Sequence, residues 1–112
     1  MVETYENVLR ELRLLLEESA APAGTPPLAS MEDGLTGGYA LALALENERA
    51  RLRREIGDLA GAPPVEDDDR LEQLSKLSAR LSGVEVDLER LRAMLAELHR
   101  RASRLRAGAV AI

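Results

Sequence analysis

Few residues in this chain have the type and spacing that catalysis or metal binding requires. His99 is the only histidine and cysteine is absent, which argues against a metal site of the usual type and against a histidine-activated nucleophile. The acidic run from Glu66 to Asp69 is contiguous and lacks the alternating ligands and the glycine of a calcium loop. Its place before an expected helix suits the positive end of a helix dipole. We therefore expect no enzyme activity, no metal and no cofactor.

Glycines and arginines form two further clusters. Gly34, Gly37 and Gly38 match neither of the common glycine-rich phosphate-binding motifs. The segment from His99 to Arg106 contains four arginines. These could contact phosphate or an acidic partner, or they could complement the negative end of a helix and face solvent. Both interpretations remain open from the sequence.

The strongest pattern is a 3–4 spacing of apolar residues that runs through the last third of the chain. Ten positions follow it: Leu74, Leu77, Leu81, Val84, Leu88, Leu91, Leu95, Leu98, Ala102 and Leu105. Sustained heptads of this kind indicate a long helix that packs against other helices along its length. The stripe is either a core within the chain or, in part, an interface with another chain.

Composition and charge favour packed helices. Tyr5 and Tyr39 are the only aromatic residues, and the chain is rich in leucine, alanine, glutamate and arginine. Residues 1–69 carry a net charge of −9 and residues 70–112 a net charge of +4, which favours contact between the two parts and equally favours head-to-tail or antiparallel self-association. No signal peptide or apolar span of about 20 residues is evident. We expect a soluble, cytoplasmic protein, and the excess of arginine over lysine suggests a bacterial source.

We predict a single all-α domain over residues 1–112. Helices are expected at about 4–19, 39–60 and 68–106, followed by a tail at 107–112. A linker at 21–38, rich in proline and glycine, is either a flexible tether or a functional loop. The short connection after the second helix predicts an antiparallel coiled-coil hairpin of two long helices, with the short N-terminal helix completing a three-helix bundle. We expect this bundle to be oligomeric.

The second predicted helix is too short to cover the whole stripe. We expect it to cover the part from Leu74 to Leu88, while the part from Leu91 to Leu105 needs the first helix, a second copy or a foreign helix. The predicted partner or oligomer interface consists of Leu88, Leu91, Leu95, Leu98 and Leu105, with Arg101 and Arg104 at its rim.

These patterns favour a non-enzymatic protein–protein interaction module, such as a scaffold, adaptor or regulator. It would act through coiled-coil packing, with itself as a homodimer or higher oligomer, or with another helical protein. The short first helix, the Glu46–Leu52 segment and the long leucine-rich helix together resemble the helical bundles of flagellar and type III secretion export chaperones. That resemblance implies binding of an amphipathic client helix. A third hypothesis is nucleic-acid or nucleotide binding through the basic end, although the chain has no net basic domain. We expect no membrane partner.

Overall fold

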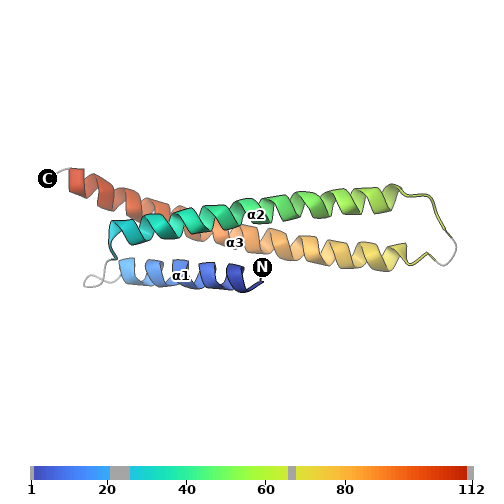
Figure 1. Cartoon of the computed structure of the whole chain (residues 1–112), viewed down its shortest axis with the longest axis horizontal. Helices are drawn as coiled ribbons and strands as arrows, with labels where there is room; N and C mark the ends of the chain where they lie inside the picture. The colour runs from blue at the N-terminus through green and yellow to red at the C-terminus, as the bar shows by residue number, and fades with distance from the viewer. Residues whose placement is uncertain (1, 21–25, 66–67, 111–112) are drawn as a thin grey trace. The chain divides into compact units, whose positions relative to one another are not determined.

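The protein is built from three helices. The computed structural model describes residues 2–20, 26–65 and 68–110, and these contain helices but no strands. The helices are α1 (Val2–Ala20), α2 (Leu28–Gly61) and α3 (Arg70–Val110), shown in Figure 1. The predicted all-α class is confirmed, and the helices bury their apolar faces against one another.

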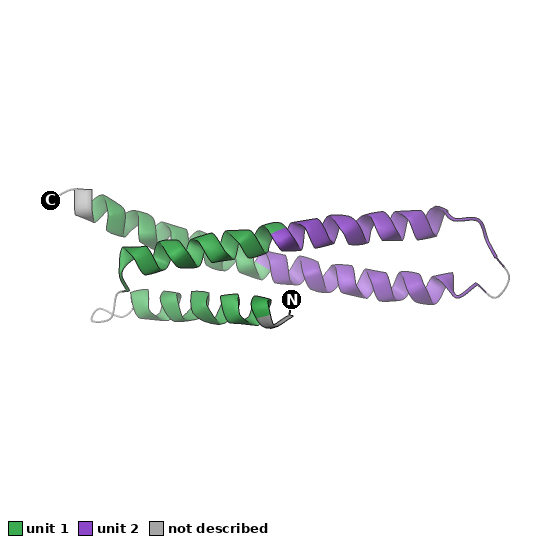
Figure 2. Ribbon diagram, viewed as in Figure 1, with its two compact units in different colours: residues 1–43, 90–112 green, residues 44–89 purple. Residues whose placement is uncertain are grey.

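The helices contribute to two compact units. Unit 1 contains residues 1–43 and 90–112, and unit 2 contains residues 44–89 (Figure 2). Both α2 and α3 therefore supply residues to each unit.

Unit 1 has a core made of leucine, methionine and alanine side chains. Its buried apolar residues are Leu9, Leu12, Leu15, Met31, Leu35, Leu41, Ala42, Leu91, Leu95, Leu98 and Ala102. They come from α1, the first part of α2 and the last part of α3. In α1 the buried leucines lie three residues apart, which places them on one side of the helix. The helix is held by this apolar side, because an isolated helix of its length is marginal in water.

The predicted linker over residues 21–38 is wrong for its second part, because α2 begins at Leu28 instead of about Tyr39. The carbonyl oxygen of Pro27 accepts hydrogen bonds from the N–H groups of Ser30 (3.0 Å) and Met31 (3.2 Å), which form the first turn. Proline is tolerated at a helix start because its missing N–H is not needed there. Residues 21–25 of the predicted linker lie outside the described residues.

Gly34 and Gly38 lie within α2, and leucine side chains fill the space that a Cβ atom would take at each position. A Cβ atom on Gly34 would lie 2.5 Å from Cδ1 of Leu15. A Cβ on Gly38 would overlap the side chain of Leu95, with its Cγ 3.3 Å away. Glycine costs a helix about 1 kcal/mol relative to alanine. Here that cost is offset by the close approach of buried leucines from α1 and α3.

Unit 2 contains the last part of α2 and the first part of α3, which lie side by side (Figure 2). Its buried side chains include Leu45, Leu52 and Leu88. Ion pairs join the two helices, Glu48 with Arg80 at 3.3 Å and Arg53 with Glu85 at 3.6 Å. Both arginines are largely exposed, so apolar contact supplies most of the stability of this unit.

Arg70 ties the start of α3 to the end of α2. Its guanidinium donates hydrogen bonds to the carbonyl oxygens of Ala62 (2.6 Å) and Pro63 and forms an ion pair with Asp68 at 3.2 Å. The Asp68 carboxylate also accepts the backbone N–H of Arg70 at 2.9 Å, which caps the first turn of α3. Glu66 and Asp67, which precede Asp68 in the acidic run, lie outside the described residues.

Candidate interaction surface

Four of the five leucines that we predicted at a partner interface are buried in the core of their unit. The exposed fraction is 1% for Leu88, 0% for Leu91, 3% for Leu95 and 0% for Leu98, whereas Leu105 is 37% exposed. The first four side chains have no free surface while their units are folded. Of this predicted set, Leu105 and the exposed Arg104 remain accessible to a partner.

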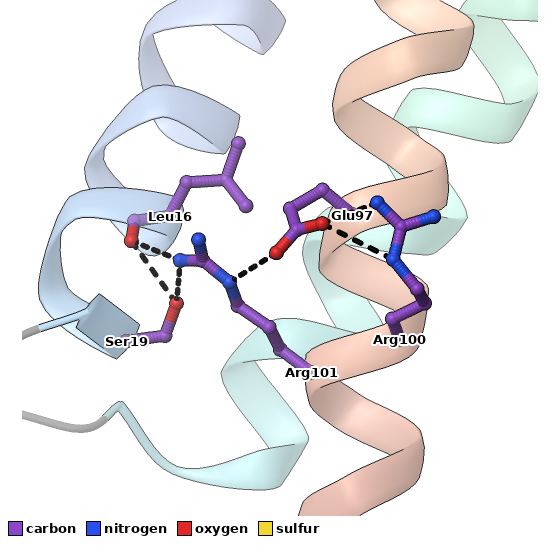
Figure 3. A network of polar contacts seen from close by, with 5 residues as sticks. All are labelled: Leu16, Ser19, Glu97, Arg100 and Arg101. Carbon is purple, nitrogen blue, oxygen red and sulfur yellow. Dashed lines mark hydrogen bonds and ion pairs between the residues drawn. The ribbon is translucent and has the colours of Figure 1, made fainter.

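Arg101, which we predicted at the interface rim, reaches the C-terminal end of α1 instead (Figure 3). Its Nη1 donates to the carbonyl oxygen of Leu16 and to Oγ of Ser19 at 2.6 Å, and its Nε donates to Oε1 of Glu97 at 2.9 Å. Carbonyl groups near the C-terminal end of a helix carry partial negative charge and attract a cation. The guanidinium therefore holds the end of α1 against α3.

Glu97 forms ion pairs with two arginines of α3. Its Oε2 accepts from Nε of Arg100 at 3.1 Å and also from Nη2 of that residue, beside the contact with Arg101. Hydrogen bonds from Arg100, and then those from Arg101, lower the pKa of Glu97 below its ordinary value. Arg106 in turn pairs with Glu32 of α2 at 2.9 Å. Much of the basic cluster is thus matched by carboxylates of the same chain.

The apolar stripe of unit 2 is only partly covered. Four side chains on α3 are half-buried, and we call them the open stripe: Leu74, Leu77, Leu81 and Val84. On α2, Ile56 and Leu59 are likewise half-buried. We expected the part of the stripe near Leu74 to be covered and the part near Leu95 to be open, and the structure shows the reverse. The heptad positions from Leu91 to Ala102 are buried within unit 1, where α1 adds a third helix, and unit 2 has two helical segments.

Charge is segregated around the open stripe. Glu72, Lys76 and Arg80 follow one another at four-residue spacing along one line of α3, and Lys76 pairs with Glu72 at 3.2 Å. Arg80 contacts Glu48, whose pKa is lowered mainly by a hydrogen bond from Arg51 and also by the charges of Arg51 and Arg80. These charges mark one flank of the stripe.

The other flank of the open stripe carries no charge over three helical turns. Leu71, Ser75, Ser78 and Ser82 recur there at four- and three-residue spacing, and all four are exposed. An uncharged flank lets a second helix approach α3 without leaving a charge unpaired.

A second exposed apolar surface lies on α2 in unit 1, and sequence reasoning missed it. Tyr39 is 50% exposed and Leu43, one turn later, is 59% exposed. With the exposed residues Thr36, Gly37 and Ala40 they form what we call the Tyr39 face. The sequence signal for this surface is the absence of charge from Gly34 to Leu45, part of which lies in the predicted linker.

Membrane spans and metal sites are missing from the described residues. Within the described part of the chain, no helix combines the length and the apolar character that crossing a membrane requires. Residues 2–20, 26–65 and 68–110 also contain no group of three or more histidine, cysteine, aspartate or glutamate side chains that could hold a metal ion.

Comparison with protein-family models, with curated proteins and with solved structures found no match. Function is therefore inferred from the surfaces of the chain itself.

Proposed function

We propose that the protein is a non-enzymatic helical interaction module, a scaffold, adaptor or regulator that binds a partner helix at the open stripe of unit 2. In this proposal the helical segments of unit 2 form an antiparallel coiled-coil hairpin that leaves one long groove for the partner. The module is further proposed to work as a self-associated assembly.

The half-burial of the open stripe is the observation that supports this function. In unit 1 the residues of the same heptad pattern from Leu91 to Ala102 are buried beneath three helices. In unit 2 the side chains of the open stripe, from Leu74 to Val84, are only half-buried between two helical segments. An amphipathic helix laid in a groove is a common mode of recognition, read as apolar anchors at three- and four-residue spacing.

Covering the open stripe would contribute useful binding energy. Burial of apolar side chains is worth about 0.8 kcal/mol per CH₂ group. The four half-buried side chains keep only the smaller part of their surface exposed, so completing their burial is worth roughly 1–3 kcal/mol before the entropic cost of association. Such a gain suits reversible binding, since further contacts along the uncharged flank would add to it.

Affinity capture with matched variants tests the proposal. The double variant Leu77→Asp/Leu81→Asp places two charges in the stripe, whereas Ala79→Asp places a charge on the exposed side of the same helix turn. Proteins captured by the wild type and by Ala79→Asp, but lost with the double variant, are the expected partners. Leu77→Ala/Leu81→Ala, which keeps helix propensity high, should weaken the same capture if the aspartate variant unfolds. Equal capture by all variants contradicts the proposal.

The export-chaperone alternative uses the same groove, with the amphipathic helix of a secreted client as the bound partner. It is distinguished by the identity of the proteins captured. The nucleic-acid alternative draws less support from the structure, because Arg100 and Arg101 contact Glu97 and Arg106 contacts Glu32. A steep loss of DNA or RNA binding with increasing salt would revive it.

A further inference from the structure

The Tyr39 face is an apolar surface on one helix that no described residue covers. Tyr39 and Leu43 expose half or more of their side chains, although both lie in the middle of α2. Gly37 has open space where a Cβ atom would point, and Ala40 beside it is small and exposed. A second helix can therefore come close to α2 here, with the larger side chains as anchors.

We propose that the Tyr39 face is where two copies of this chain meet, α2 against α2 in antiparallel order. The inference rests on the self-association in the proposed function, but it uses a surface other than the open stripe. Each copy could then bind a partner helix at unit 2 while the pair is held together through α2.

The shape of the face suits pairing with itself. Large and small residues lie beside one another on it, with Tyr39 and Leu43 next to Gly37 and Ala40. In a symmetric contact the large side chains of one copy lie over the small residues of the other, as ridges fit into grooves. An interface core with tyrosine and few charges is also typical of protein–protein contacts.

Charge along α2 selects the antiparallel order. Residues Gly34 to Leu45 are uncharged, Glu32 and Asp33 precede them, and residues 46–55, which follow, hold three glutamates and four arginines with a net charge of +1. Asp33 lies ten residues before Leu43, and Arg54 lies eleven residues after it. Antiparallel helices that cross near Leu43 therefore bring Asp33 of each copy level with Arg54 of the other. A parallel pair would place like charges together, which is unfavourable.

Asp33 and Arg54 are available for this contact. Both are exposed, and neither forms an ion pair with another residue in the part of the chain that the structure describes. Charge reversals at these positions would therefore leave the ion pairs within the chain intact, which makes them clean probes of the interface.

The test is the molar mass of the purified full-length chain by light scattering over a range of concentrations. The wild type should form dimers, and Leu43→Asp should raise the dimer dissociation constant at least about tenfold by facing two aspartates across the axis. The control Leu14→Asp alters another exposed leucine of unit 1, 51% exposed on α1, and should leave the mass unchanged. Helical circular dichroism checks that each variant is folded.

Charge reversal tests the order of the helices. Asp33→Arg should weaken the dimer several-fold, and Asp33→Arg together with Arg54→Asp should restore it. Because the chain has no cysteine, Leu43→Cys should also form a disulfide-linked dimer readily, whereas Leu14→Cys should not.

A monomeric wild type, or a dimer that Leu43→Asp leaves unchanged, overturns the inference. So does a dimer that is lost in Leu77→Asp/Leu81→Asp and retained in Leu43→Asp, because the copies would then meet at the open stripe. Selective loss of partner capture at that stripe would still support partner binding by unit 2 in each of these cases, whereas a monomeric wild type would remove the proposed self-association.

Discussion

The glycines of α2 give the sharpest prediction about the fold, because three of them within one helix have different surroundings. Gly37 has nothing within 4 Å of the position that a Cβ atom would take, so Gly37→Ala should gain helix propensity without a clash. We expect it to raise the free energy of unfolding by about 0.5–1 kcal/mol.

Gly38→Ala should instead lower the free energy of unfolding. Its new methyl group would overlap Cδ2 of Leu95, lie 3.3 Å from Cγ of the same residue and 3.5 Å from Cδ1 of Leu12. Because both leucines are buried, the whole Leu95 side chain must shift. Overpacking costs about 1–3 kcal/mol, and the propensity gain offsets up to about 1 kcal/mol of it. We expect a net loss of up to about 2.5 kcal/mol.

Gly34→Ala should fall between the other two variants, because its methyl group meets mainly the mobile end of Leu15, at 2.5 Å. Urea denaturation followed by far-ultraviolet circular dichroism, which reports helix content, gives the three free energies of unfolding. Equal stabilisation by Gly37→Ala and Gly38→Ala would refute the close packing against Gly38. At concentrations where the chain is monomeric, destabilisation by Gly37→Ala would contradict the open surroundings of Gly37 in a helix.

Three further predictions concern α3. Leu98→Ala should destabilise the fold by about 2–5 kcal/mol because Leu98 is fully buried, whereas Leu105→Ala should cost less than about 1 kcal/mol, as urea denaturation can show. Arg101→Ala should speed amide hydrogen exchange at the end of α1, since its guanidinium holds that end, while Arg100→Ala should leave this exchange unchanged. The lowered pKa of Glu97 contributes stability that is present above its unfolded-state pKa and is lost as pH falls through the folded-state value. Glu97→Gln should therefore reduce the loss of stability on acidification, and an unchanged acid transition would contradict this.

The helices could be predicted from the sequence because heptad spacing and helix propensity depend on residues that are close together in the chain. The leucine stripe from Leu74 to Leu105 predicted helix, and α3 covers that range. The segment around Gly34 and Gly38 is helical, whereas its sequence predicts a linker, because glycine disfavours a helix on propensity alone. Its tolerance depends on leucines of α1 and α3, which are distant in sequence. A seven-residue spacing that joins Met31, Gly38 and Leu45 was the signal that could have corrected the boundary.

The candidate surface was harder to predict than the helices. A stripe shows that a helix packs, but it does not show which other segment covers each part. Leu95 and Leu98 pack beside Gly38 and Gly34 of α2, where the buried leucines of α1 also meet α2 because the glycines leave room. Arg101 illustrates the same limit, since its acceptors Leu16 and Ser19 lie more than eighty residues earlier in the chain.

Hydrogen exchange on the captured complex tests the central claim most directly. Amide exchange would be compared between the free chain and the chain bound to a partner recovered by affinity capture. Binding at the open stripe predicts added protection at residues 74–84 of α3 and near Ile56 and Leu59 of α2. Added protection confined to α1 or to the basic end of α3, with residues 74–84 unchanged, would contradict the claim that unit 2 supplies the partner-binding surface.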